Sequence, residues 1–323
     1  VHAAELWGIS GIFAPIWRPS PILPPLWQRR RKETGLAGPG RRERRQGEGQ
    51  AYGPGGRARL SLRQILRPVT RPMFPLRDDN PTEIFPLVTL LIMGACIGVW
   101  VLVQGAGGPA LFSSICAFGA IPLEIAGPLM NSASASGEAP CALGGLTWAT
   151  LVTSMFLHGS WMHLIGNLWF LWIFGNNVED SMGHGRFLVF YLLTGVAAAG
   201  SHIAFDPGSA LPMVGASGAI SAIMGAYLVL YPKARVHTRF IIIIIIRVIP
   251  LPAWIFLLYW LLIQLASSAM DMPGGGGVAF WAHIGGFVAG VGLVKIFQNR
   301  VLVRAKRSGV QVARREIPGG GWW

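Results

Sequence analysis

The sequence is poor in charged residues. They make up 13% of its 323 residues, against roughly 25% in an average globular chain. Hydrophobic residues make up 52%, and the mean hydropathy is +0.49. So few charges cannot cover a water-facing surface of this size, which excludes an ordinary soluble protein. The composition indicates a polytopic membrane protein.

Basic residues are absent from three of the loops that separate the apolar segments. Six segments reach the length needed to cross a bilayer, and they are 84–104, 158–176, 187–204, 215–232, 251–269 and 279–298. The loops 105–157, 205–214 and 270–278 contain no Lys or Arg. Basic residues gather in cytoplasmic loops, so this pattern predicts six spans with both termini in the cytoplasm. We therefore expect an all-α membrane bundle.

The net charge of +13 comes mainly from residues 1–72, which combine Arg clusters with Pro-rich apolar patches. Two interpretations of this basic segment remain open. It is a disordered extension, or it lies outside the natural product, because Met73 opens a more ordinary start. No recognition motif accompanies the charge, so we expect no nucleic-acid partner. The membrane domain is expected at 73–300 and a basic C-terminal tail at 301–323.

The apolar run 241–246 is too short and too interrupted by the following Arg247, Pro250 and Pro252 to form a seventh span. We expect an interfacial or re-entrant piece there. Cys116 and Cys141 lie in the long first loop, on the predicted non-cytoplasmic side, where disulfides persist. They could pair or remain buried thiols, and the sequence leaves that choice open.

Acidic residues are absent from all six segments, and no His-Glu-x-x-His motif occurs. These absences exclude an aspartyl or a zinc intramembrane protease, and no metal or cofactor is implied. Polar residues inside spans are costly and therefore informative. His163, Asn167, Ser217 and His283 lie near the starts of the second, fourth and sixth segments, which all run inward. A hydroxyl, two imidazoles and an amide at one depth can supply a nucleophile, a base and oxyanion donors.

Small residues recur every fourth position on the fourth and sixth segments. Such stripes let helix backbones approach closely in lipid, so we expect these two helices to bring Ser217 near His283. The stripes are Gly218, Ala222 and Ala226 on one helix, and Ala282, Gly286 and Gly290 on the other.

Three motifs occur in a characteristic order: His-x-x-x-Asn at 163–167, Gly-Ala-Ser-Gly at 215–218 and Ala-His-x-x-Gly-Phe-x-x-Gly at 282–290. Together with the six segments and the long first loop, they resemble the rhomboid intramembrane serine proteases over residues 73–300. The resemblance implies a Ser-His dyad without a third carboxylate. Ser217 would be the nucleophile and His283 its general base.

The same resemblance implies that His163 and Asn167, with the backbone N–H of Ser217, form the oxyanion hole, and that Glu179 is a structural carboxylate. The substrate would be a transmembrane or membrane-anchored protein cut near the outer membrane face. The protein itself would be a multi-pass membrane protein in contact with lipid. We expect a bacterial plasma (inner) membrane, with the active site on the non-cytoplasmic side.

Two positions depart from the family pattern. Ser221 stands where many members have an aromatic residue that stacks on the histidine, so either its hydroxyl bonds to His283 or Ile220 supplies the packing. Trp148 is followed by Ala149 rather than by the Arg common in the first loop. The alternative function is a catalytically silent rhomboid-like protein that binds membrane clients. The presence of both Ser217 and His283 favours the protease.

Overall fold

The structure is a computed structural model that describes residues 73–126, 141, 148–242, 245–270 and 279–307. Residues 1–72 and 308–323, on which the expectations of an extension and a tail fall, lie outside the described residues.

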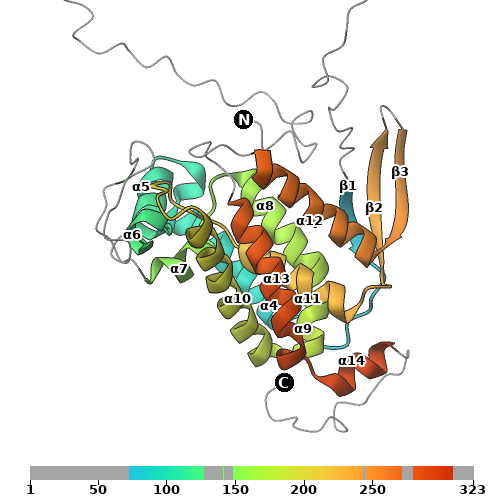
Figure 1. The fold of residues 1–323 in the computed structure, drawn as a ribbon. Helices are drawn as coiled ribbons and strands as arrows, with labels where there is room; N and C mark the ends of the chain where they lie inside the picture. Colours follow the sequence, from blue (N-terminus) through green and yellow to red (C-terminus); the bar gives the residue numbers. More distant parts are fainter. Residues whose placement is uncertain (1–72, 127–140, 142–147, 243–244, 271–278, 308–323) are drawn as a thin grey trace, which may run out of the picture. The chain divides into compact units, whose positions relative to one another are not determined.

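Helices dominate the fold (Figure 1). Helical segments occupy each of the six predicted ranges. The first range holds α4 (Leu87–Gly98), followed by the π-helix η2 (Val99–Val103). The second holds a continuous run of α8 (Trp161–Phe170), η6 (Leu171–Gly175) and α9 (Asn176–Met182). The other four hold α10 (His184–Phe205), α11 (Ser217–Leu230), α12 (Ala253–Met270) and α13 (Phe280–Phe297).

Shorter helices fill the first loop and follow the last long helix. They are η3 (Gly105–Gly107), α5 (Ala110–Phe118), α6 (Pro122–Ala126), α7 (Thr150–Thr153), η5 (Ser154–Phe156) and α14 (Arg300–Arg307). Among the described helices, α10 and α13 are each long and apolar enough to cross a membrane. The apolar helices in 87–103, 217–230 and 253–268 are shorter.

The expectation of an all-α fold is wrong in one region. Strands β1 (Met73–Asp78), β2 (Arg235–Ile242) and β3 (Ile245–Pro252) form an antiparallel sheet in the order β1–β2–β3. The run predicted as an interfacial or re-entrant piece is instead the end of β2 and the start of β3. Burial alternates along β2, where Val236 and Thr238 are buried between more exposed neighbours. This alternation and the β-branched residues favour an extended chain.

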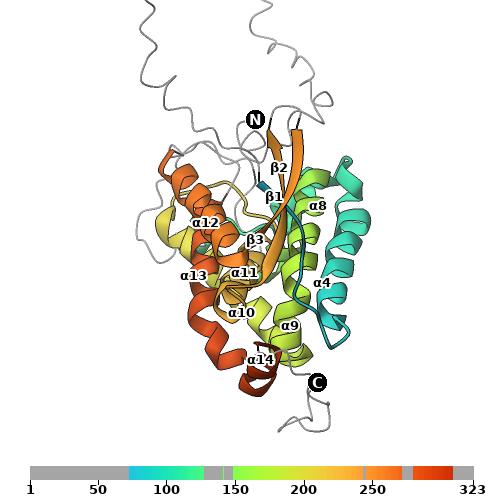
Figure 2. The same ribbon diagram turned by 90° about the vertical axis from the view of Figure 1, so that its right-hand side faces the viewer.

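The sheet lies against the helices beside α12 and α8 (Figures 1 and 2). The indole N–H of Trp169 in α8 donates to the carbonyl oxygen of Pro75 in β1 at 2.7 Å, and α12 contacts both β2 and β3. Strand β3 is an edge strand whose Pro250 and Pro252 pair with β2. A proline has no N–H to donate, which an edge position tolerates.

Helices α11 and α13 pack backbone against backbone. A Cβ added at Gly286 would collide with the carbonyl oxygen of Gly218, and one added at Gly290 would collide with that of Ala222. The two predicted stripes of small residues therefore face each other. This contact is the close approach that such residues permit.

The buried carboxylate of Glu179 in α9 holds the first turn of α4. It accepts hydrogen bonds from the backbone N–H groups of Val88 and Thr89, both at 2.8 Å, and from the Thr89 hydroxyl at 2.7 Å. It also contacts Nδ1 of His184 at 2.6 Å. These amides belong to the first turn of α4, where backbone N–H groups have no intrahelical acceptor. The structural role expected for Glu179 is confirmed.

Helix α14, at the start of the predicted basic tail, joins this end of the bundle through charged contacts. Lys306 donates to Asp180 at 2.6 Å and to Asn177 at 3.1 Å. The guanidinium of Arg307 donates to the carbonyl oxygens of Leu230 and Val229, at 2.8 and 2.7 Å. The chain after α13 thus packs onto α9 and caps the end of α11.

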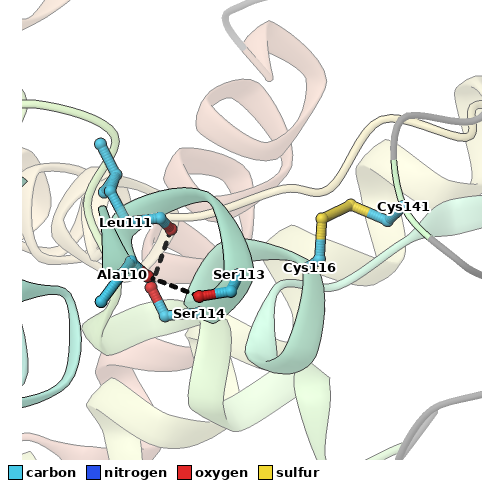
Figure 3. Close-up of a disulfide and its surroundings, with 6 residues drawn as sticks. All are labelled: Ala110, Leu111, Ser113, Ser114, Cys116 and Cys141. Atoms are coloured by element: carbon cyan, nitrogen blue, oxygen red, sulfur yellow. Dashed lines mark hydrogen bonds between the residues drawn. A yellow bond between two sulfur atoms is a disulfide. The ribbon is translucent and has the colours of Figure 1, made fainter. Parts of the chain in front are cut away.

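Cys116 of α5 and Cys141 form a disulfide, with a Cα–Cα distance of 5.3 Å (Figure 3). The choice that the sequence left open is resolved in favour of pairing. Cys141 also belongs to a small buried cluster with Ile121, Leu123 and Ala210. The bridge therefore joins two parts of the first loop, at a cluster that also includes Ala210 of the third loop.

Replacing Glu179 by Ala should strongly destabilise the fold. Two buried backbone N–H groups would lose their acceptor, at about 1–3 kcal/mol each. Thermal unfolding followed by tryptophan fluorescence in detergent should show a clear decrease in Tm. The matched control is Glu83→Ala, because Glu83 is exposed. Equal Tm values for the two variants would contradict this role.

Asp78 should make stability depend on pH. Its burial raises its pKa from 3.8 to about 6, although a hydrogen bond from the Tyr227 hydroxyl acts in the opposite direction. Because the folded pKa is the higher one, this contribution to stability is complete below the unfolded value and is lost as pH rises through about 6. Asp78→Asn, whose amide oxygen can still accept that bond, should gain Tm relative to wild type as pH rises from about 4 to 8. A difference in Tm that is independent of pH would contradict the assignment.

Candidate active site

Ser217 and His283 are hydrogen-bonded. Ser217 is the first residue of α11 and His283 lies in the first turn of α13, one turn before the contact of Gly286 with Gly218. The hydroxyl oxygen of Ser217 is 2.7 Å from Nε2 of His283. Ser217 is partly exposed, whereas His283 is only 8% exposed. A neutral imidazole at this distance can accept the hydroxyl proton.

The start of α8 orients His163. Ser160 is the N-cap, and its hydroxyl accepts a hydrogen bond from the backbone N–H of His163 at 3.1 Å. The backbone N–H of Gly159 donates to Nδ1 of His163 at 3.3 Å. Because Nδ1 is an acceptor here, the proton of the neutral ring is on Nε2. His163 therefore presents an N–H donor at Nε2.

Gly215 lies directly beside the side chains of His163 and Asn167. It has a φ of +122°, in the region that favours glycine. A Cβ at this position would lie 2.6 Å from Nε2 of His163 and 3.6 Å from the side-chain nitrogen of Asn167. That nitrogen is buried and has no hydrogen-bond partner among the described residues. Two side-chain donors thus lie beside Gly215, and that of Asn167 is unused among the described residues.

The first turn of α11 also borders this region. The backbone N–H groups at the start of a helix have no intrahelical partner, and the helix macrodipole places partial positive charge there. Ser217 therefore offers both a hydroxyl and a helix N-terminal amide. The four residues singled out in the sequence contribute a hydroxyl, an imidazole acceptor and two further donors.

The packing expected from Ile220 stays a prediction, whereas the hydrogen bond to His283 expected from Ser221 is wrong. The Ser221 hydroxyl donates to the backbone carbonyl of Ser217 at 2.7 Å, not to His283. The aromatic contact to His283 comes from Trp260 of α12, whose ring centroid is 6.0 Å away with an interplanar angle of 42°. Trp260 is one of several aromatic residues in an apolar segment, so sequence position alone gave no signal for this contact.

Sequence reasoning also missed Gln264. Its side-chain oxygen is 2.8 Å from Nδ1 of His283, and the residue is 1% exposed. The available signal was a single amide in an otherwise apolar span, which is costly unless it is used. Trp260 and Gln264 are four residues apart, so both lie on the face of α12 that contacts His283.

His158 lies beside the site. Its ring centroid is 5.2 Å from that of His163, and the residue is fully buried. The Gln104 side chain holds its backbone through hydrogen bonds to the N–H and to the carbonyl oxygen, at 2.9 and 2.8 Å. The loop that precedes α8 is thereby attached to the end of η2.

Metal ligation receives no support from the part of the chain that the structure describes. No group of three or more His, Cys, Asp or Glu residues in it could hold a metal ion. The described groups nearest Ser217 are instead those of a proton-transfer pair and of hydrogen-bond donors.

Residues 145–300 match the family model of the rhomboid domain. The chain is 33% identical over 168 residues to the rhomboid protease GluP of Bacillus subtilis, a match that covers 50% of this chain and 29% of that protein. It is 26% identical over 172 residues to the mitochondrial rhomboid protein 1 of Saccharomyces cerevisiae, covering 51% of this chain and 46% of that one.

A third relative is the chloroplastic rhomboid-like protein 11 of Arabidopsis thaliana, 44% identical over 73 residues, or 23% of this chain and 26% of that one. The chain thus spans less than half the length of each of these relatives. Because relatives are mitochondrial and chloroplastic as well as bacterial, the expectation of a bacterial plasma membrane is not supported. The matched domain contains His163, Asn167, Ser217 and His283, and this domain belongs to the rhomboid family of polytopic helical membrane proteins.

Proposed function

We propose that this protein is an intramembrane serine endopeptidase in which Ser217 is the nucleophile and His283 the general base. The observation that carries the proposal is the 2.7 Å hydrogen bond between the Ser217 hydroxyl and Nε2 of His283. As Ser217 attacks a peptide carbonyl, His283 takes its proton and later delivers it to the leaving amine. Water then hydrolyses the acyl-enzyme by the same route.

Asn167, His163 and the backbone N–H of Ser217 stabilise the oxyanion of the tetrahedral intermediate. The unpartnered amide of Asn167 and the orientation of His163 support this role. The donors are already in place before the reaction, so little reorganisation is needed as negative charge develops on the carbonyl oxygen. Gly215 leaves room for that oxygen.

We further propose six membrane spans, with both termini in the cytoplasm and the active site at the non-cytoplasmic side. The loops without Lys or Arg support this topology. The Cys116–Cys141 disulfide, which lies in one of these loops, supports it as well, because disulfides persist on the non-cytoplasmic side. The first turns of α11 and α13, which carry Ser217 and His283, also directly follow such loops.

The substrate is a transmembrane or membrane-anchored protein cut near the outer membrane face. A continuous α-helix satisfies its own carbonyls and keeps them away from a nucleophile. Substrates should therefore carry small or helix-weakening residues around the scissile bond.

A fluorophosphonate probe should label the wild-type protein in detergent but neither Ser217→Ala nor His283→Ala. The reaction reports an activated serine without requiring a known substrate, and loss of either dyad member should lower the labelling rate by roughly 10³-fold or more. The matched control is Ser113→Ala, because the Ser113 hydroxyl donates to a carbonyl of its own helix and bonds to no other described residue. Labelling that persists in Ser217→Ala would refute the dyad. If the wild-type protein stays unlabelled while a known serine hydrolase reacts, the client-binding alternative is favoured.

Removing an oxyanion donor or filling its space should slow labelling while leaving the dyad in place. Asn167→Ala and Gly215→Ala are each expected to reduce the rate about 10²–10³-fold. Gly292→Ala is the control for glycine replacement, because a Cβ there meets no atom within 4 Å. Wild-type rates in both site variants, measured on protein with unchanged Tm, would remove these residues from the oxyanion hole.

A further inference from the structure

We propose that Gln264 positions His283 for catalysis, as the third member of a Ser217–His283–Gln264 chain of hydrogen bonds. This inference rests on the proposed function, because it concerns the base of that reaction. Gln264 contacts neither substrate nor Ser217, so it is a positioning residue. It takes the place that a carboxylate has in a Ser-His-Asp triad.

The two ring nitrogens of His283 have different partners. Nε2 lies 2.7 Å from the Ser217 hydroxyl and Nδ1 lies 2.8 Å from the Gln264 side-chain oxygen. A carbonyl oxygen can only accept a hydrogen bond, so this contact requires a proton on Nδ1. The neutral ring then has its lone pair on Nε2, which is the form that accepts the proton of Ser217.

An amide can fill this role without a charge. After proton transfer the imidazolium still donates from Nδ1 to the same oxygen, so Gln264 remains a satisfied partner throughout the step. The papain-like proteases use an asparagine beside their histidine in the same sense. A neutral amide also avoids the cost of placing a carboxylate inside a membrane segment.

The burial of Gln264 indicates that its contact with His283 is a specific interaction. Gln264 is 1% exposed in a helix whose other buried residues are mainly apolar, such as Phe256, Leu257 and Trp260. A buried amide costs free energy unless it is hydrogen-bonded. Its oxygen is directed at His283, and Trp260, one turn earlier on α12, packs against the same ring.

The test compares the fluorophosphonate labelling rate of Gln264→Leu and Gln264→Glu with that of the wild type between about pH 5 and 9. Leucine removes the acceptor, and a loosely held base should lower the rate roughly 10²-fold. Glutamate restores an acceptor, so it should recover most of the rate. Its carboxylate favours the imidazolium, so the acidic limb of the pH profile should move to higher pH. His163 and His202, also near His283, are unchanged in both variants, so this shift reports position 264.

The matched control on the same helix is Ser268→Ala, because the Ser268 hydroxyl donates to the carbonyl of Leu265 and bonds to no other residue in the described part of the chain. It should label within about twofold of wild type. A wild-type rate for Gln264→Leu overturns the positioning role while leaving Ser217 as nucleophile. If leucine impairs folding, seen as a lower Tm, an acidic limb in Gln264→Glu identical to wild type overturns the role instead. Failure of the dyad would appear separately, as labelling that survives Ser217→Ala.

Discussion

The backbone contact between α11 and α13 is the constraint on which the candidate site depends. Gly286 lies on the carbonyl of Gly218 and Gly290 on that of Ala222. Ser217 immediately precedes the first of these contacts, and His283 lies one turn before it on the opposite helix. Any side chain at Gly286 or Gly290 would push the helices apart and lengthen the Ser217–His283 hydrogen bond. The packing of these two helices and the geometry of the Ser217–His283 pair therefore depend on the same contacts.

The buried polar contacts at the two ends of the bundle differ in kind. At the Ser217 end the contacts join a hydroxyl, imidazoles and amides. At the other end Glu179, Asp180 and Lys306 form buried ionic and charge-assisted contacts. Charges are expensive within a membrane, so these buried charged contacts are consistent with that end lying at a membrane surface. The neutral end can then retain polar groups at depth for chemistry.

The sequence was sufficient to predict the positions of the long helices and the meeting of Ser217 with His283. Apolar length and the spacing of small residues determine both, because each follows from local composition and helix geometry. The family resemblance supplied the roles proposed for His163 and Asn167. The protonation of the His163 ring, by contrast, became readable only from the Gly159 hydrogen bond.

The sheet and the α12 contacts could not be predicted in this way. An isoleucine run suits a strand as well as an interfacial segment, and the pairing of β2 with β1 joins residues far apart in the chain. Gln264 and Trp260 are likewise defined by what another helix places opposite them. A single amide in an apolar helix signals a partner, but not which one.

The contact of Lys306 with Asp180 has a consequence for the order in which the protein can be completed. Asp180 also accepts hydrogen bonds from the backbone N–H groups of Glu83 and Ile84, just before α4. Lys306 follows Asp180 by 126 residues. During synthesis the segment leading into α4 can therefore meet Asp180 early, while the countercharge arrives only after α13 has been made. Until then Asp180 lacks its ion pair with Lys306, and assembly of this region ends with the helix that is synthesised last among those described.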